Sequence, residues 1–368
     1  MAYKFFVLGD QHLKNQDHLG VITKQGVNSR LLDKIAVLDS FIKQAILEKA
    51  TDIVLLGDIF HGFSPDERVR KIFWKTMASA IKSGIHIYIM RGNHDTYGET
   101  ANLDAEEPIL ASTVKILPND LYTEVFDKAK IGQNTLKIAF IPYKDDAEII
   151  KNYAEKCKDC HIVFGHIEIA GATLGADNHQ MRSEVPKTLF NTQLLVWLGH
   201  IHKHQEIEAN RFAYLGSTTK CDFAEREDRK VYGIIDISNN GEIKTEFRDI
   251  PQRPMIQVDV LEEDVTNLYN AKEIPDSINI SGALLKLMLI GSSSWMKTIN
   301  RVKFKKRFTK VLKVSFGDKK TDTVEQTVIG TNSSLMEDRV KVFNESRSKG
   351  PEYLKVGLEL TSLTRQSI

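Results

Sequence analysis

Eight aspartate, asparagine and histidine side chains in this sequence stand at the ends of short apolar runs, each with a glycine close by. Three of the runs read FVLGDQH at 6–12, VLLGDIF at 54–60 and LVWLGHIH at 195–202. All of these side chains offer nitrogen or oxygen atoms, which suits Mn²⁺, Fe²⁺, Zn²⁺ or a similar divalent ion. In chain order, the candidates are Asp10, His12, Asp58, Asn93, His94, His166, His200 and His202.

Divalent ions held by such a set could act on phosphate esters. Two ions about 3.5–4 Å apart can hold an attacking hydroxide and stabilise a leaving oxygen. The two oxygens of Asp58 could each bind one ion, so this carboxylate could bridge them. His200 and His202 would point to the same side of an extended segment and could serve neighbouring ions. Each short motif is common alone, and the ordered set at successive strand ends is what indicates a metal site.

The candidate ligands can meet only if the apolar runs are strands whose ends converge. Apolar runs alternate with amphipathic stretches over residues 1–250, which predicts an α/β fold with its sheet covered on both faces. Residues 30–49 and 65–84 have the apolar spacing of helices. In open α/β sheets, ligands bind beyond the carboxyl ends of the strands, where a glycine permits a sharp turn. We therefore expect the site at that edge.

The motifs GDQH, GDIFH, GNHD, GHIE and GHIH resemble the five motifs of calcineurin-like metallophosphoesterases, in the family's order. Within that superfamily, the chain is most similar to the Mre11/SbcD-type DNA-repair nucleases and to phage recombination nucleases of that group. The segment YLGSTTKCDFAE at 214–225 resembles the Pro-Gly-Ser segment that follows their last motif, with Leu215 in place of the usual proline. The resemblance spans about residues 1–250.

This resemblance implies a double β-sheet sandwich flanked by helices, with a smaller α/β capping domain. It implies a two-metal-dependent DNA nuclease, an exonuclease with single-strand endonuclease activity as a further capability, that acts in DNA recombination, repair or replication. The expected cofactors are two divalent ions, with Mn²⁺ favoured over Mg²⁺, and the expected partners are DNA, a Rad50/SbcC-like ATPase and a second copy of the chain. The alternative is a phosphatase or small-nucleotide phosphodiesterase of the same superfamily. A scaffold without catalysis is disfavoured because every expected ligand is present.

Carried onto this sequence, the resemblance divides the ligands between two ions. The expected ligands of one ion are Asp10, His12, Asp58 and His202. The expected ligands of the other are Asp58, Asn93, His166 and His200. His94 matches the family's catalytic histidine, which would donate a proton to the leaving oxygen or stabilise its charge. His61 matches a histidine that steers a DNA strand in some relatives, and Asp95 could orient His94.

The composition changes near DIPQRPM at 249–255, where two prolines indicate a linker. We expect a nuclease domain over 1–250, a capping and DNA-binding domain over 251–330, and a segment that binds the ATPase partner over 331–368. The last of these includes a predicted amphipathic helix around 335–349.

A basic cluster lies at 297–320, where ten Lys or Arg residues accompany one Asp. Such a cluster can bind a phosphate backbone independently of sequence, or it can be a solvated face. The candidate DNA contacts are Lys305, Lys306 and Arg307. The interleaved aromatic residues, which we expect in a core, are Phe304, Phe308 and Phe316.

The overall composition limits where the protein works. The net charge of +1 over 368 residues excludes a strongly basic field over the whole chain. Three cysteines are too few for a disulfide framework, and Cys157-x-x-Cys160 has no second pair, which favours surface or packed thiols over a zinc or redox site. No signal peptide is apparent, and no apolar run approaches the ~20 residues of a membrane span. We expect no membrane partner and a cytoplasmic location, in the host cell if the source is viral.

Overall fold

The computed structural model describes residues 2–97, 100–103, 112–175, 179–264, 281–306 and 308–321. The chain divides into two compact units, Met1–Gln252 and Arg253–Ile368. Arg307 and the expected partner-binding segment 331–368 lie outside the described residues. Among the helices of the described part, none combines the length and apolar character that crossing a membrane requires.

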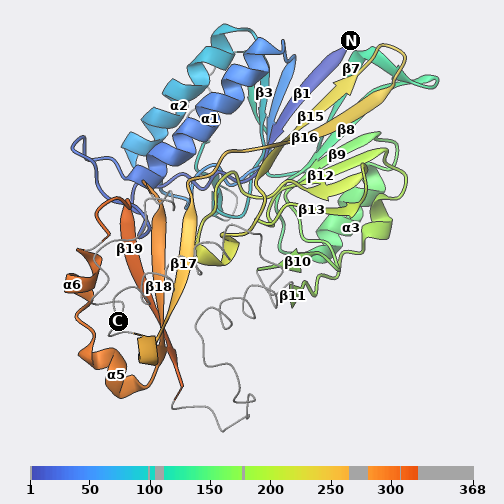
Figure 1. The fold of residues 1–368 in the computed structure, drawn as a ribbon. Coiled ribbons are helices and arrows are strands. Elements are labelled where there is room, and N and C mark those ends of the chain that lie inside the picture. The colour runs from blue at the N-terminus through green and yellow to red at the C-terminus, as the bar shows by residue number, and fades with distance from the viewer. Residues whose placement is uncertain are drawn as a thin grey trace. The chain divides into compact units, whose positions relative to one another are not determined.

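Two six-stranded mixed sheets form the first unit (Figure 1). The first sheet runs β16 (Ile243–Asp249), β15 (Val231–Ile237), β1 (Tyr3–Leu8), β2 (Asp52–Leu55), β3 (His86–Ile89) and β6 (Val114–Ile116). The second runs β13 (Gln205–Glu208), β14 (Phe212–Tyr214), β12 (Leu195–Leu198), β9 (Ile162–Gly165), β8 (Asn134–Ile141) and β7 (Tyr122–Ile131). The strands β1, β2, β3 and β6 are mutually parallel, and so are β8, β9, β12 and β14.

Strand β1 shows why these strands are apolar on both faces. Phe5 and Val7 point into a core shared by the two sheets, whereas Phe6 and Leu8 point to the opposite face, into a core shared with helices. Successive side chains of a strand alternate between faces, so a strand covered on both faces needs apolar residues throughout. Helices cover one face of the first sheet, and the second sheet covers its other face. The predicted helix-flanked double-sheet sandwich is therefore confirmed.

Helices cover the outer face of each sheet. On the first sheet lie α1 (Ser29–Leu47) and α2 (Glu67–Lys82), which match the predicted ranges to within two residues. Asn28 and Asp66 cap them by accepting hydrogen bonds from backbone N–H groups of the first turn. On the second sheet lie α3 (Ala147–Lys156) and the 3₁₀ helix η2 (Lys187–Phe190). The short remaining elements are β4 (Thr96–Tyr97), β5 (Thr100–Ala101), β10 (Thr173–Leu174), β11 (His179–Gln180) and η3 (Phe223–Glu225).

The two cysteines of the Cys-x-x-Cys sequence pack at the end of α3. Cys157 and Cys160 are buried free thiols in the apolar core under the second sheet. Burial raises the pKa of Cys157 to about 12 and that of Cys160 to about 11. Both thiols therefore stay protonated at neutral pH, and of the two expected placements, surface or packed, the structure shows packed thiols.

The described residues of the second unit form three parallel strands, with two short helices between β18 (Leu284–Gly291) and β19 (Lys313–Lys320). Its elements are β17 (Met255–Leu261), η4 (Glu262–Asp264), β18 (Leu284–Gly291), α5 (Ser293–Thr298), α6 (Arg301–Lys305) and β19 (Lys313–Lys320). Phe304 is buried in its core, and Phe308 and Phe316 pack against that core, as predicted. Lys305 and Lys306 are exposed.

Asp52, the first residue of β2, is a buried carboxyl whose charge should destabilise the fold. Its side chain is 2% exposed, and one of its oxygens has no hydrogen-bond partner. Burial raises its pKa from 3.8 to about 6. Above that pKa the folded protein must hold a buried charge, so the cost is absent at low pH, grows as the unfolded chain ionises, and is complete above about pH 6.

We expect Asp52→Asn to stabilise the protein more at high pH than at low pH. The increase in the free energy of unfolding over the wild type should be about 1–2 kcal/mol larger at about pH 8 than at about pH 5. Urea unfolding at both pH values measures this difference, in which any cost of burying the amide cancels. The control is Asp39→Asn on α1, where the carboxylate is 43% exposed and faces Lys43 Nζ at 2.6 Å, and this variant should show no such gain in stability at high pH. Equal effects of Asp52→Asn at both pH values would contradict the prediction.

Candidate metal centre

The candidate ligands follow five strands, three from the first sheet and two from the second. Within each sheet these strands are parallel, so their carboxyl ends share an edge. The strands and the ligands after them are β1 with Asp10 and His12, β2 with Asp58, β3 with Asn93, β9 with His166, and β12 with His200 and His202. Contacts between His200 and Asp10 and between His166 and Asp58 join the edges of the two sheets.

The glycines beside the ligands serve close approach as well as turning. Gly57 has φ +101°, a conformation that side-chain-bearing residues rarely adopt. At Gly92, a Cβ atom would lie 2.0 Å from Asp58 Oδ1, so only glycine lets the GNHD turn approach this carboxylate. Three candidate ligands themselves have left-handed backbones, with φ of 46°, 49° and 84° at His12, Asp58 and His200. Such strained positions cluster at functional sites.

The first ligand set gathers around His12. Its Nε2 atom lies 2.8 Å from His202 Nε2 and 3.5 Å from Asp58 Oδ2. Single ligand atoms of Asp10, His12 and His202 all lie within 4.8 Å of one another. Lys34 Nζ donates to the His12 carbonyl oxygen at 2.7 Å and braces this turn.

The second set gathers around Asn93. Its Oδ1 atom lies 3.1 Å from His166 Nε2 and 3.0 Å from His200 Nδ1. His166 Nε2 is also 3.5 Å from Asp58 Oδ2. The same oxygen of Asp58 is therefore equally distant from an imidazole of each set, and this carboxylate lies between them.

Four of the candidate metal ligands are histidines, and in three of them one ring nitrogen contacts an oxygen acceptor while the other faces the site. His166 Nδ1 donates to the carbonyl oxygen of Leu56 at 2.8 Å. His200 Nε2 and His202 Nδ1 each lie 2.9 Å from a carboxylate oxygen, of Glu168 and Glu225 respectively. Such partners fix the tautomer of metal-binding histidines and leave a lone pair for the metal.

The charges of the site favour a bound cation. Burial raises the pKa of Asp10 to about 6. Burial also acts to raise the pKa of Asp58, but the charge of His166 outweighs it and the pKa is lowered. Burial disfavours the charged His166 imidazole, yet the Asp58 carboxylate raises the pKa of this histidine to about 9. The carboxylates of this pocket therefore favour positive charge even where the site is fully buried.

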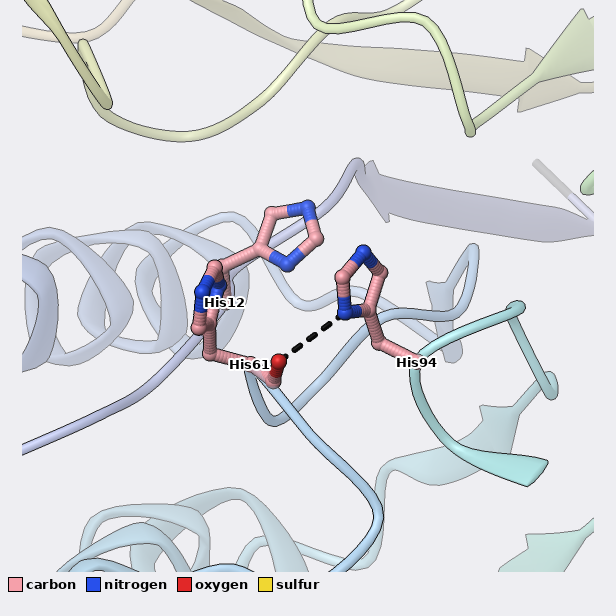
Figure 2. Close-up of side chains that lie close together, drawn as sticks. All are labelled: His12, His61 and His94. Atoms are coloured by element: carbon pink, nitrogen blue, oxygen red, sulfur yellow. Dashed lines mark hydrogen bonds between the residues drawn. The ribbon is translucent and has the colours of Figure 1, made fainter. Parts of the chain in front are cut away.

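His94 lies at the open side of the site with His61. Figure 2 shows the imidazoles of His12, His61 and His94 gathered together, with His94 Nδ1 donating to the His61 carbonyl oxygen at 2.9 Å. The rings of His61 and His94 stack with centroids 5.3 Å apart. This hydrogen bond leaves His94 Nε2 as the atom that could serve a substrate. His61 is exposed, and Lys14 Nζ lies 3.2 Å from its Nε2 atom.

Asp95 has a different role from the predicted one. Its carboxylate accepts hydrogen bonds from the backbone N–H of Gly92 at 3.0 Å and from the side-chain amide of Asn102 at 3.1 Å. It also accepts from the N–H groups of Ile59 and Phe60 in the loop that follows β2. Asp95 therefore ties the GNHD turn to the loop after β2, while the His61 carbonyl orients the ring of His94.

Comparison with known proteins identifies the family. The model of the calcineurin-like phosphoesterases matches residues 3–204, more than half of the chain. The chain belongs to the calcineurin-like phosphoesterase family. It is 27% identical to the SbcD subunit of the nuclease SbcCD of Staphylococcus saprophyticus over 280 residues, covering 69% of this chain and 72% of that protein. The corresponding protein of Staphylococcus epidermidis is 24% identical over 282 residues, with the same shares covered.

Solved structures of similar proteins include two from other organisms. A dimetal phosphatase from Danio rerio is 10% identical, with a TM-score of 0.43, covering 68% of this chain and 97% of that one. The TT1561 protein of Thermus thermophilus is 14% identical, with a TM-score of 0.39, covering 68% of this chain and 100% of that one.

The protein is thus a metal-dependent phosphoesterase, and its donor set fits the divalent ions of this family. Ring nitrogens that face the site, an amide oxygen and two carboxylates are suitable ligands for Mn²⁺, Fe²⁺ or Zn²⁺. When bound, such ions supply an activated water and stabilise charge on phosphate oxygens. The chain's own part is to hold the donors in place and to present His94 at the open side.

Sequence reasoning missed the two glutamates that orient the histidines, and it was wrong about the His200 backbone. Glu168 belongs to the GHIE motif, but its partner His200 is 32 residues away. Glu225 follows the last motif, and its partner His202 is 23 residues away. The segment from His200 to His202 is not extended, because His200 has a left-handed backbone. The two imidazoles contact different groups: His200 Nδ1 lies 3.0 Å from Asn93 Oδ1, and His202 Nε2 lies 2.8 Å from His12 Nε2.

Glu225 should strengthen metal binding through His202. Its Oε2 atom also accepts from the fully buried Lys230 Nζ at 2.7 Å, and Lys230 donates to the His202 carbonyl at 2.8 Å. Glu225→Gln should weaken Mn²⁺ binding about 10- to 100-fold, because the amide cannot hold the imidazole through a charged hydrogen bond. Calorimetric titration of the metal-free protein measures this. Glu227→Gln, whose carboxylate faces Arg226 at 3.5 Å, is the control. Wild-type affinity in Glu225→Gln would refute this role.

Proposed function

We propose that the protein is a two-metal-dependent DNA nuclease that hydrolyses phosphodiesters in DNA recombination, repair or replication. It acts as an exonuclease and cuts single strands internally. It works as a homodimer and as the nuclease subunit of a complex with a Rad50/SbcC-like ATPase. Mn²⁺ is its preferred metal, and Mg²⁺ is the second candidate.

The observation that carries this proposal is the similarity to the SbcD subunit of the nuclease SbcCD. That similarity covers 69% of the chain and therefore extends beyond the family match at residues 3–204. A relative that shared only the catalytic motifs would not match over this length. The name of this relative also describes one subunit of a larger nuclease, which supports a partner protein for this chain.

The assignment of ligands supports hydrolysis of a phosphodiester. In this proposal one ion is held by Asp10, His12, Asp58 and His202, and the other by Asp58, Asn93, His166 and His200. In its protonated form His94 donates the Nε2 proton to the leaving oxygen and becomes a neutral imidazole, and the His61 carbonyl stabilises the positive charge of the protonated ring before the transfer through its 2.9 Å hydrogen bond. His61 itself, beside Lys14, contacts the DNA strand.

One assay separates this proposal from its alternative. The protein is incubated with Mn²⁺ or with Mg²⁺ on end-labelled single-stranded and duplex DNA. The small esters p-nitrophenyl phosphate and bis-p-nitrophenyl phosphate are the comparison substrates. We expect DNA cleavage in Mn²⁺. Turnover of the small esters with intact DNA would instead support the phosphatase or small-nucleotide phosphodiesterase.

The exposed lysines of the second unit supply a second test. Lys305 and Lys306 project from the end of α6, where Lys305 Nζ lies 5.8 Å from the centre of the Phe316 ring. Each cation that binds a DNA phosphate releases counterions, so binding depends on salt. Lys305→Glu with Lys306→Glu should weaken DNA binding and reduce its salt slope by roughly one for each phosphate that is no longer neutralised.

The control for this double variant has the same change in net charge. Lys71→Glu with Lys75→Glu places the substitutions on the exposed side of α2 in the first unit. Filter binding over a range of salt concentrations compares the two variants. Hydrolysis of bis-p-nitrophenyl phosphate should stay unchanged in both. Equal salt slopes for the two variants would remove Lys305 and Lys306 from the DNA interface.

A further inference from the structure

Two exposed aromatic side chains lie against each other in the first unit. Ten large hydrophobic residues are exposed in the described part of the chain, and the two aromatic ones among them are Phe63 and Tyr97. Their side chains are 37% and 77% exposed. Their ring centroids are 5.8 Å apart, and the ring planes are tilted by 46°. Two aromatic rings that share one exposed spot form a surface on which a flat ligand can stack.

This aromatic pair comes from the same two loops that carry His61 and His94. Phe63 follows His61 by two residues, and Tyr97 follows His94 by three. The stacked rings of His61 and His94 and the hydrogen bond from His94 Nδ1 to the His61 carbonyl oxygen join these loops. Asp95 joins them a second time through the backbone N–H of Phe60 and of Ile59. The aromatic pair is therefore held next to the open side of the metal centre.

The surroundings favour a nucleotide as the occupant. Lys14 Nζ, 3.2 Å from His61 Nε2, places a cation beside the same loop. An exposed aromatic surface next to a cation and a phosphate-cleaving centre matches the three parts of a nucleotide: base, charged backbone and scissile ester. Stacking on aromatic side chains accepts any base, because every base has a π-face.

We infer that Phe63 and Tyr97 form a stacking site for an unpaired base next to the phosphate that is cut. This inference rests on the proposed nuclease function and extends it to the form of the substrate. A base inside a duplex is covered by its neighbours and cannot stack there, whereas a base in a single strand or at a frayed end can. The protein should therefore bind unpaired ends more tightly than continuous duplex, with little dependence on base identity.

The binding experiment uses the full chain without metal, so that DNA is bound and not cut. Single-stranded oligonucleotides carry the fluorescent base 2-aminopurine at successive positions from one end. Stacking on an aromatic ring quenches the emission of this base, so we expect quenching at one or two positions in the wild type. Phe63→Ala and Tyr97→Ala should remove the quenching and raise Kd about 5- to 100-fold. Tyr97→Phe keeps an aromatic ring and should therefore keep both the quenching and the wild-type Kd.

Two controls separate stacking from a general effect on the fold. Leu47→Ala truncates a side chain that is 73% exposed at the end of α1, and it should change neither signal. The second control alters the DNA: an abasic residue at the quenched position should weaken wild-type binding to the level of Tyr97→Ala. Tyr97→Ala should bind the abasic DNA as tightly as it binds intact DNA, because the variant has already lost the ring on which the base would stack.

The outcomes distinguish this inference from the proposed function. If the wild type binds and cuts single-stranded DNA but both alanine variants keep its affinity and quenching, the stacking site is refuted and the nuclease stands. If abasic DNA binds the wild type as tightly as intact DNA, the stacking site is refuted as well. If the wild type neither binds nor cuts DNA in any form, the nuclease proposal itself fails.

Discussion

Asp58→Asn should abolish phosphoester hydrolysis, with a loss of at least about a thousandfold on any substrate. Asp58 Oδ2 lies 3.5 Å from His12 Nε2 in one ligand set and from His166 Nε2 in the other. Its Oδ1 atom accepts the backbone N–H of His94 at 2.9 Å. An asparagine that keeps this hydrogen bond must turn its NH₂ group toward the two imidazoles. The variant would therefore place a hydrogen-bond donor at the position where the two candidate ligand sets share a carboxylate oxygen.

The metal content of this variant should fall together with its activity. Elemental analysis after incubation with Mn²⁺ should show fewer bound ions per chain than in the wild type. Asp52→Asn is the matched control because Asp52 is a buried carboxyl at the opposite end of the same strand. It should keep wild-type metal content and hydrolysis of bis-p-nitrophenyl phosphate. If Asp58→Asn retained the wild-type rate in Mn²⁺, Asp58 could not be the carboxylate shared by the two ligand sets.

The strand ends could be predicted because burial on both faces leaves a strong sequence signal. β1 and β2 end in apolar runs, residues 5–8 and 53–55, and each run is followed within two residues by glycine and then a polar candidate ligand. The positions of α1 and α2 could also be predicted from the sequence, since both helices have helical apolar spacing and capping residues, Asn28 and Asp66. These features depend on residues close in sequence, and the local pattern therefore contains them.

The arrangement of the two sheets is not present in any local pattern. β1 pairs antiparallel with β15, more than 220 residues later in the chain. The sequence of neither strand identifies the other as its partner. The apolar runs predicted cover on both faces but could not show that one cover is a second sheet. The double-sheet sandwich came from the family resemblance and not from the pattern of apolar residues.

The site shows the same limit at the level of single side chains. Its ligands carry a signal because metal-binding residue types recur beside glycine. Glu168 and Glu225 carry none, since a glutamate that orients a distant histidine looks like any other surface glutamate. Asp95 was misread for a related reason. Its neighbour in sequence is His94, but burial turns its carboxylate toward the N–H groups of the turn.

His94→Ala should bind metal normally and turn over slowly, with the loss depending on the leaving group. For DNA, whose leaving group is an alkoxide that needs a proton, we expect a loss of about 10²–10⁴-fold in kcat. For bis-p-nitrophenyl phosphate the loss should be much smaller, because p-nitrophenolate is a stable anion and leaves without protonation. The geometry supports this role, since Nδ1–H donates to the His61 carbonyl and Nε2 faces away from it, so that the protonated ring can give its Nε2 proton to the leaving oxygen.

The alternative for His94 is a role as a metal ligand, since single ring nitrogens of His12, His61 and His94 lie within 4.8 Å of one another. Calorimetric titration of His94→Ala with Mn²⁺ decides between the two. His86→Ala is the matched control because His86 is an exposed histidine at the opposite end of β3, the strand that precedes His94. If His94→Ala loses metal affinity and both substrates slow equally, His94 binds metal. Normal affinity with a loss confined to DNA identifies it as the proton donor.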